Sequence, residues 1–243
     1  MELEQVLEKN RTLHHMMQKA TVDALDFQNA TEQLHSLLQC SVYIINKEGT
    51  LLGCKDTEGM QLLSRQELEQ RQCSQDNLDW MLSIRHPVCN QQHNGNYLAL
   101  VPVNGQSEPM GLLICGREQE PFAEEGQLLT EYAATLASVM MIRAASRKAE
   151  TEARKKNVVQ LALEVLSYSE LEAVKYIFNE IDGNEGFLVA SKLAEEYKLT
   201  RSVIVNALRK LESAGVIDAR SLGMKGTYIK ILNDYLYEEL AAI

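Results

Sequence analysis

The chain has 243 residues, which is enough for one large or two modest domains with an ample core. Its hydrophobic fraction of 45% is ordinary for a soluble globular protein, and no uninterrupted apolar run approaches the roughly 20 residues that a membrane span needs. The net charge is −10, so a locally basic segment in this chain has meaning as a binding surface.

The N-terminus and the cysteines indicate the compartment. The chain begins with MELEQ, which lacks the basic-then-apolar layout of a secretory signal. The cysteines are odd in number, scattered and without a CxxC pair, which fits reduced, mainly structural thiols and disfavours a zinc site. The five cysteines are Cys40, Cys54, Cys73, Cys89 and Cys115. We therefore expect a cytoplasmic protein with no membrane partner and no metal.

The N-terminal part is expected to form an α+β domain, because helical and strand periodicities alternate along it. The expected elements, in order, are a mainly helical segment 2–39, strands 41–45 and 50–54, short helices 66–72 and 75–82, and strands 97–103 and 110–115. A helix, a hairpin, short helices and a second hairpin follow one another in GAF- and PAS-like sensor domains, although many α+β domains share this order. Such a sheet cups a small molecule against its short helices.

From Glu124 the pattern is helical again. Its first part has an apolar stripe, the segment from Arg143 to Lys156 is highly charged, and apolar residues resume at Val158. One helix from Glu124 to Leu166 would be roughly 65 Å long at 1.5 Å per residue. Such a connecting helix is either a signalling linker with dimer contacts or a plain solvated spacer.

A second domain is expected to begin at Ser167. Ser167 and Glu170 have the spacing of a capping box, and the helix that they start is expected to end at residues 182–184. The predicted organisation is therefore a GAF-like sensor domain at 1–145, a helical linker at 146–166 and a DNA-binding domain at 167–243.

Residues 190–209 have the pattern of a helix-turn-helix motif. Apolar residues fall on one face of a first short helix, and Ala194 is small enough for two helices to cross closely there. Thr200 is placed to cap the second helix, because its hydroxyl can accept a backbone N–H that has no other partner. The inward stripe of that helix consists of Ile204, Ala207, Leu208 and Leu211.

The segment after this helix is predicted to be a wing. Gly215 is suited to end the helix, since glycine tolerates positive φ. Strands are expected at 216–221 and 227–231, joined by the glycine-punctuated turn 222–226. The predicted fold is thus α+β, with an N-terminal GAF-like domain, a long connecting helix and a C-terminal winged helix-turn-helix.

The outward residues of this motif suit double-stranded DNA. Between Ala190 and Lys230 there are eight basic and four acidic residues, in a chain that is acidic as a whole. Arg and Asn can bond to guanine and adenine edges, and Arg, Lys and Ser can hold phosphates. The alternative is a solvated helical hairpin with ordinary surface charge. The predicted DNA-binding residues are Ser191, Lys192, Thr200, Arg201, Ser202, Asn206, Arg209, Lys210, Arg220, Ser221, Lys225 and Thr227.

Two stretches carry a family resemblance. Residues 200–217, TRSVIVNALRKLESAGVI, and residues 220–227, RSLGMKGT, resemble the signature of the CodY family, and the chain resembles that family in length and domain order. The family consists of global transcriptional repressors of low-GC Gram-positive bacteria. The resemblance implies an N-terminal GAF domain that senses branched-chain amino acids, namely isoleucine, leucine or valine, and in many members a response to GTP.

The resemblance also implies an effector site. In relatives this pocket is built from a helix with an arginine and methionines, an Arg-Gln-Phe-Pro run with a tyrosine three residues on, and a Phe-Pro-Val turn. Here the Phe-Pro pair is replaced by Cys73 and Ser74, and Arg65 is the nearest candidate for the carboxylate-binding arginine, although a gap would place Gly59 there. The alternative is therefore a transcription regulator that has a different effector or none. The effector-site residues implied are Met60, Leu63, Arg65, Arg71, Cys73, Ser74, Asn77, His86, Pro87 and Val88, and Met60, Leu63 and Val88 are alternatively ordinary core.

GTP binding rests on the resemblance alone, because the chain has no GxxxxGK[ST] loop to cradle phosphates. An enzyme is the rival from another class, with His86 and Cys89 as base and nucleophile. Nothing in the sequence identifies an orienting carboxylate or an oxyanion donor for that pair. We therefore expect no catalytic residues. We expect a homodimer, since one recognition helix contacts too few bases to specify a genomic site.

Overall fold

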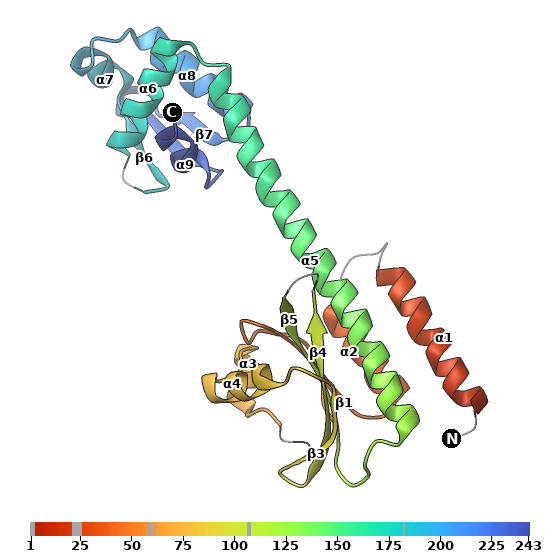
Figure 1. The fold of residues 1–243 in the computed structure, drawn as a ribbon. Helices are drawn as coiled ribbons and strands as arrows, with labels where there is room; N and C mark the ends of the chain where they lie inside the picture. The colour runs from red at the N-terminus through yellow and green to blue at the C-terminus, as the bar shows by residue number, and fades with distance from the viewer. Residues whose placement is uncertain (1–2, 21–25, 58–59, 61, 106–107, 182) are drawn as a thin grey trace. The chain divides into compact units, whose positions relative to one another are not determined.

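The computed structural model describes residues 3–20, 26–57, 60, 62–105, 108–181 and 183–243 (Figure 1). The chain divides into two compact units, Met1–Ser146 and Arg147–Ile243. Within the described residues, none of the helices is both long enough and apolar enough to span a membrane.

The first unit is built on a five-stranded antiparallel sheet in the order β2-β1-β5-β4-β3. The predicted short helices and the four predicted strands of this unit are confirmed, as is the helical segment 2–39 except for its residues 2 and 21–25, which lie outside the described residues. Its elements before the long helix are α1 (Leu3–Ala20), α2 (Phe27–Leu38), β1 (Ser41–Asn46), β2 (Leu51–Lys55), α3 (Arg65–Gln70), α4 (Gln75–Ser83), β3 (Val88–His93), β4 (Asn96–Asn104) and β5 (Pro109–Arg117).

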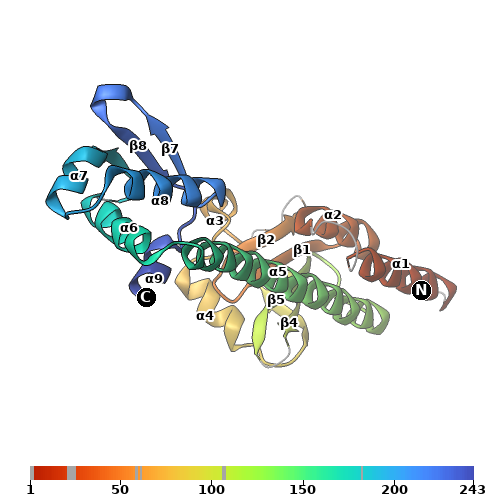
Figure 2. The ribbon, with the colours of Figure 1, turned by 90° about the horizontal axis from the view of Figure 1, so that it is seen from above.

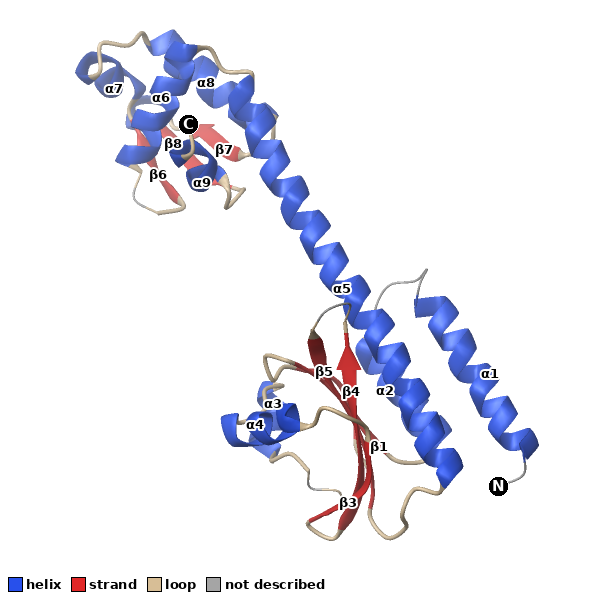
Figure 3. Cartoon of the chain, in the orientation of Figure 1, coloured by secondary structure: helices blue, strands red, loops and turns tan. Residues whose placement is uncertain are grey.

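Each face of this sheet has its own apolar core, because side chains alternate along a strand. On β1, Val42 and Ile44 belong to the core that contains residues of α1, α2 and the long helix α5 (Glu124–Glu164). Tyr43 and Ile45 belong to the core on the other face, which also contains Met81 of α4. Figure 3 shows α3 and α4 on one side of the sheet and α2 and α5 on the other.

Strand β3 was not predicted, for a physical reason. It is an edge strand that pairs only with β4, and its residues are partly exposed, so it lacks the apolar alternation by which strands are recognised. Its register shifts between Val88 and Gln91, and Asn90 lies in the left-handed region with φ of +60°. Asn90 also bonds to the backbone of Phe122, which fixes the loop that leads to α5.

The long helix is continuous from Glu124 to Glu164, over nearly all of the span expected from the sequence. Its charged residues 145–155 are exposed. Of the apolar stripe in its first part, Leu129, Leu136 and Met140 are buried in the first unit, whereas Leu128 and Tyr132 are exposed. Val159, Ala162 and Leu163, which the sequence analysis assigned to the linker, are buried in the core of the second unit.

Over the described residues, the second unit contains the last part of α5, four further helices and a three-stranded antiparallel sheet in the order β6-β8-β7. The hairpin of β7 and β8 extends beyond α8 (Figure 2). The strand β6 was not predicted; it is four residues long and forms the other edge of the sheet. The elements are α6 (Tyr168–Glu180), β6 (Glu185–Leu188), α7 (Ala190–Glu196), α8 (Arg201–Ser213), β7 (Ile217–Ser221), the 3-10 turn η1 (Gly223–Lys225), β8 (Thr227–Ile231) and α9 (Leu236–Ala241).

Candidate nucleic-acid interface and effector residues

The helix-turn-helix forms as the local sequence signals predicted. The turn after α7 is closed by a hydrogen bond from the Leu199 N–H to the Ala194 carbonyl at 2.9 Å, and Lys198 takes a left-handed conformation with φ of +55°. The Thr200 hydroxyl caps α8 by accepting the Val203 N–H at 3.4 Å. The predicted turn and cap are therefore confirmed.

The packing of α8 fixes which of its residues face solvent. Its predicted inward stripe is confirmed, because Ile204, Ala207, Leu208 and Leu211 are all buried in the core of the second unit. A helix buries one face only, so the opposite face is left for binding. The exposed residues of α8 are Arg201, Ser202, Asn206 and Arg209, and, in its last turn, Glu212 and Ser213.

The turn of the wing packs closely against the end of β6 and exposes the side chains at its tip. Gly226 has φ of +96°, and a Cβ at this position would lie 2.4 Å from the carbonyl oxygen of Leu188, the last residue of β6. The close approach of β6 to the start of β8 therefore requires glycine here. Ser221 and Lys225 are exposed at the tip, and Thr227 is half-buried. On α7, Ser191 and Lys192 are also exposed. The tip therefore offers a hydroxyl and a lysine to solvent, together with the exposed apolar side chain of Leu222.

Two of the predicted DNA-binding cations have partners within the protein. Lys210 Nζ lies 2.7 Å from Glu170 Oε2 and 3.1 Å from the Val165 carbonyl oxygen. The Lys210 ammonium and the Ser167 N–H hold the pKa of Glu170 below its usual range. Arg220 lies 2.8 Å from Asp218, with its side chain 72% exposed. Lys210 thus holds the end of α5 and the start of α6 in place.

The apolar members of the predicted effector site are packed into the sheet. Met60, Leu63 and Cys73 are each less than 10% exposed and belong to the core beneath α3 and α4. Burial raises the pKa of the Cys73 thiol to about 11, and the Glu67 carboxylate adds to this effect. Gly59, the alternative to Arg65, lies outside the described residues.

Neither predicted arginine is left without a partner. Arg65 has a side chain that is 93% exposed, and its Nε lies 3.0 Å from Glu69. Arg71 donates to the backbone carbonyls of Leu51 at 3.1 Å and Leu52 at 2.8 Å, so it ties the end of α3 to strand β2. Both arginines thus have contacts that explain their positions without a ligand.

Ser74 and Asn77 surround a buried carboxylate that the sequence analysis missed. Glu67 accepts the N–H groups of Ser64 and Ser74 at 2.8 Å each, the Ser64 hydroxyl at 2.7 Å and the Asn77 amide at 2.9 Å. Burial raises the pKa of Glu67, but these hydrogen bonds outweigh it and lower the pKa to about 2. The Ser64-x-x-Glu67 spacing is a capping box, a signal that the sequence contained.

The remaining predicted residues lie at the edge of the sheet. His86 and Pro87 are exposed, while Val88 and Cys89 are half-buried on β3. Burial raises the pKa of the Cys89 thiol, with a further contribution from Glu131, so the thiolate that nucleophilic catalysis needs is disfavoured. Over the described part of the chain, all five cysteines are free and no group of three or more His, Cys, Asp or Glu is placed to hold a metal ion.

Comparison with known proteins identifies relatives of both units. The family model described as the CodY GAF-like domain matches residues 5–165, and the CodY helix-turn-helix domain matches residues 184–242. The global transcriptional regulators CodY of Clostridium botulinum (strain Okra) and Clostridium tetani are each 43% identical to this chain over 254 residues, which cover 98% of both chains.

Solved structures also match the first unit. The cofactor-binding GAF domain of the nutrient sensor CodY from Clostridium difficile aligns with a TM-score of 0.42 and 22% identity, over 57% of this chain and 97% of that one. The GAF domain of a phosphoenolpyruvate-protein phosphotransferase from Acinetobacter aligns with a TM-score of 0.44 and 16% identity, over 61% of this chain and 99% of that one.

Proposed function

Because the chain belongs to the CodY family of global transcriptional regulators, we propose that it is a repressor whose affinity for operator DNA is set by a small effector in its GAF-like domain. It is a DNA-binding regulator and not an enzyme. The observation that carries the proposal is the division of α8 into a buried apolar face and an exposed face of Arg201, Ser202, Asn206 and Arg209.

In this proposal α8 enters the major groove. Arg201, Ser202 and Asn206 lie near its N-terminal end, the end that in such motifs points at base edges. Lys192 and Lys225 contact phosphates, where a flexible ammonium needs no fixed geometry. Lys210, which the sequence also assigned to phosphate, is left out because its ammonium pairs with Glu170.

The protein is proposed to act as a homodimer in the cytoplasm, where chromosomal DNA is accessible to it. Two related recognition helices would read half-sites one or more helical turns apart, at about 34–36 Å per turn. Exposed apolar side chains on α1 and α5 of the first unit, Leu7, Leu128 and Tyr132, support self-association. Light scattering that gave a strict monomer, both free and on DNA, would contradict this assembly.

The effector is proposed to be a branched-chain amino acid, with GTP as a second effector that the sequence supports less. The support is the family membership and an apolar floor that includes Met60 and Leu63 beneath the short helices. Titration calorimetry of the full chain with isoleucine, leucine, valine and GTP tests this directly. Saturable heat with an amino acid that also changes operator affinity supports control by it. No heat and no thermal shift at millimolar concentrations refutes it.

A further inference from the structure

The second unit exposes large apolar side chains where α5 ends and α6 begins (Figure 1). Leu161 and Val165 are 60% and 62% exposed, and Tyr168, the first residue of α6, is 78% exposed. Their neighbours Ala162 and Leu163 are buried in the core of the unit, so this end of α5 buries one side and exposes the other. Large apolar side chains that gather at a surface mark a place where another molecule binds.

The spacing of the exposed residues on α5 is that of a helix seam. Arg154, Val158, Leu161 and Val165 follow one another at intervals of four, three and four residues, which places them on one side of a helix. Val158 is half-buried, and Val165 directly follows the last residue of α5. Two helices that pack along each other use this spacing, so the exposed side of α5 suits a second helix.

The N-terminal end of this seam is basic. Residues 147–156 of α5 include five basic and two acidic side chains. Within the described residues, Lys156 pairs with Glu239 of α9 at 3.1 Å, whereas the exposed Arg154 and Lys155 form no ion pair. These two cations are therefore available to carboxylates of another molecule.

The other end of the surface lies on α6, which contains three glutamates and one lysine. The negative charge of Glu172 and a hydrogen bond to its carboxylate raise the pKa of the Tyr168 hydroxyl, so these two side chains lie together. Tyr176 stacks on Tyr197 with ring centres 3.9 Å apart, and the Tyr197 hydroxyl donates to Glu180 at 3.4 Å. Tyrosine rings beside carboxylates attract cations, and arginine in particular, because the ring face and the carboxylate are both negative.

The order of these features makes the surface complementary to a second copy of itself. Arg154 and Tyr168 stand seven residues before and seven residues after Leu161. A two-fold axis near Leu161 therefore brings the basic end of each copy to the acidic end of the other, with the apolar residues in the middle. DNA does not suit the whole surface, because the carboxylates of α6 repel phosphates.

We propose that the second units of two copies pair through this surface, with the C-terminal ends of their α5 helices antiparallel. Leu161 and Val165 lie at the centre of the contact. Arg154 of each copy contacts Tyr168 and Glu172 of the other. The proposal rests on the proposed self-association and names the part that the second unit takes in it. It places two recognition helices in one two-fold arrangement, as paired operator half-sites require.

Photocrosslinking of the full chain at about 150 mM salt tests the contact. The photoreactive residue p-benzoylphenylalanine replaces Leu161 in one variant and Phe187 in the control, because Phe187 is 67% exposed but lies on β6 beside Tyr228. We expect a product of twice the chain mass from position 161, at no less than fivefold the yield from position 187. Mass spectrometry should place the crosslink within residues 154–172 of the other copy.

Two results would overturn the contact: equal yields from the two positions, or a crosslink from position 161 to residues outside 154–172. If light scattering gives a dimer but position 161 yields no product, this contact alone is refuted. A strict monomer refutes the proposed self-association as well.

Charge reversal tests the pairing of the two ends. Arg154→Glu and Glu172→Arg, each combined with the photoreactive residue at position 161, place like charges at both contacts of the pair, so each should lower the crosslink yield at least fivefold. Mixing the two variants restores opposite charges at both contacts, so the yield should return to that of the parent. Single variants that crosslink as the parent does, or a mixture that stays at the low yield, would contradict the proposal.

Discussion

Replacing Glu67 with glutamine should destabilise the first unit in a manner that depends on pH. The pKa of this carboxyl falls from an ordinary 4.5 to about 2, and the residue is only 9% exposed. A shift of this size corresponds to roughly 3 kcal/mol of folding free energy at neutral pH. Glutamine keeps one carbonyl acceptor but presents an NH₂ to the remaining donors, so we expect a loss of about 2–3 kcal/mol at pH 7.

The sign of the pH effect follows from the lowered pKa. Because the folded pKa lies below the unfolded one, the stabilisation is complete above about pH 4.5 and is lost as the pH falls toward 2. The difference between wild type and Glu67→Gln should therefore shrink by more than half between pH 7 and pH 3. Urea unfolding followed by the fluorescence of Trp80, the single tryptophan of the chain, which lies in α4, measures it.

Glu69→Gln is the matched control, because Glu69 is on the same helix but is paired only at the surface with Arg65. Its loss should cost less than about 0.5 kcal/mol at any pH. The reasoning is refuted if Glu67→Gln unfolds within 0.5 kcal/mol of wild type at pH 7, or if its deficit is the same at pH 3.

Three further substitutions test the second unit. Lys210→Ala should lower the stability of this unit by about 1 kcal/mol or more, because the ion pair with Glu170 is lost, and it should leave the salt dependence of DNA binding unchanged. If the slope of log affinity against log salt concentration fell by about one unit instead, Lys210 would be a phosphate contact. Ala207→Glu places a charge where the native side chain is fully buried, so it should abolish both cooperative unfolding of this unit by circular dichroism and DNA binding. Gly226→Ala should cost about 1–3 kcal/mol in thermal unfolding, because its Cβ would meet the Leu188 carbonyl; an unchanged melting temperature would contradict the close approach.

The winged helix-turn-helix could be predicted from the sequence because its signals are local. The Thr200 cap, the inward stripe of α8 and the turn at Gly215, whose φ is +71°, each depend on residues a few positions apart. The edge strands β3 and β6 carry no such signal. The residues of β3 are partly exposed and show no apolar alternation, so the strand is recognised only from its pairing with β4 in the structure.

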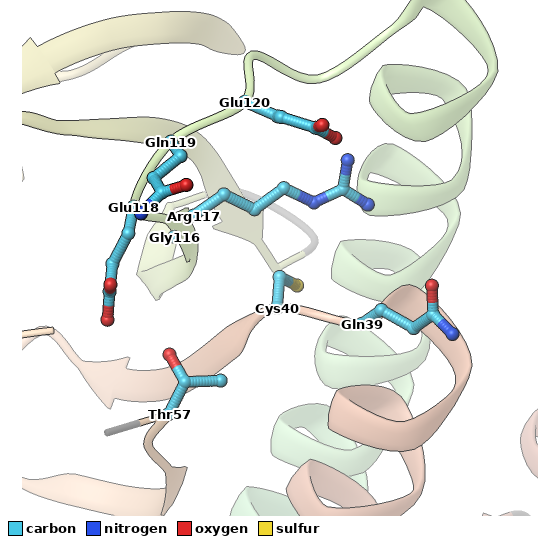
Figure 4. Close-up of a pocket in the computed structure, with 8 residues that line it drawn as sticks. All are labelled: Gln39, Cys40, Thr57, Gly116, Arg117, Glu118, Gln119 and Glu120. Atoms are coloured by element: carbon cyan, nitrogen blue, oxygen red, sulfur yellow. The ribbon is translucent and has the colours of Figure 1, made fainter. Parts of the chain in front are cut away.

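The effector residues could not be predicted in the same way, because their contacts are made across the fold. Arg71 bonds to carbonyls of β2 some 20 positions earlier in the chain, and Asn77 bonds to Glu67. Family resemblance assigned these positions to a ligand, whereas tertiary hydrogen bonding accounts for them without one. The pocket lined by Cys40, Thr57 and Arg117 (Figure 4) is formed by three segments that are far apart in the sequence, and no sequence pattern indicates that they meet.

The most direct test of the account is a fluorescence-anisotropy salt series with operator and random DNA on wild type, Asn206→Ala and Lys225→Ala. Asn206→Ala should lose about 1–3 kcal/mol on the operator and almost nothing on random DNA, because its amide is proposed to read a base edge. Lys225→Ala should weaken binding to both DNAs and lower the salt slope by about one unit, since it is proposed to contact a phosphate. If both variants bound both DNAs as wild type does at every salt concentration, the exposed face of α8 and the wing would not be the DNA-binding surface.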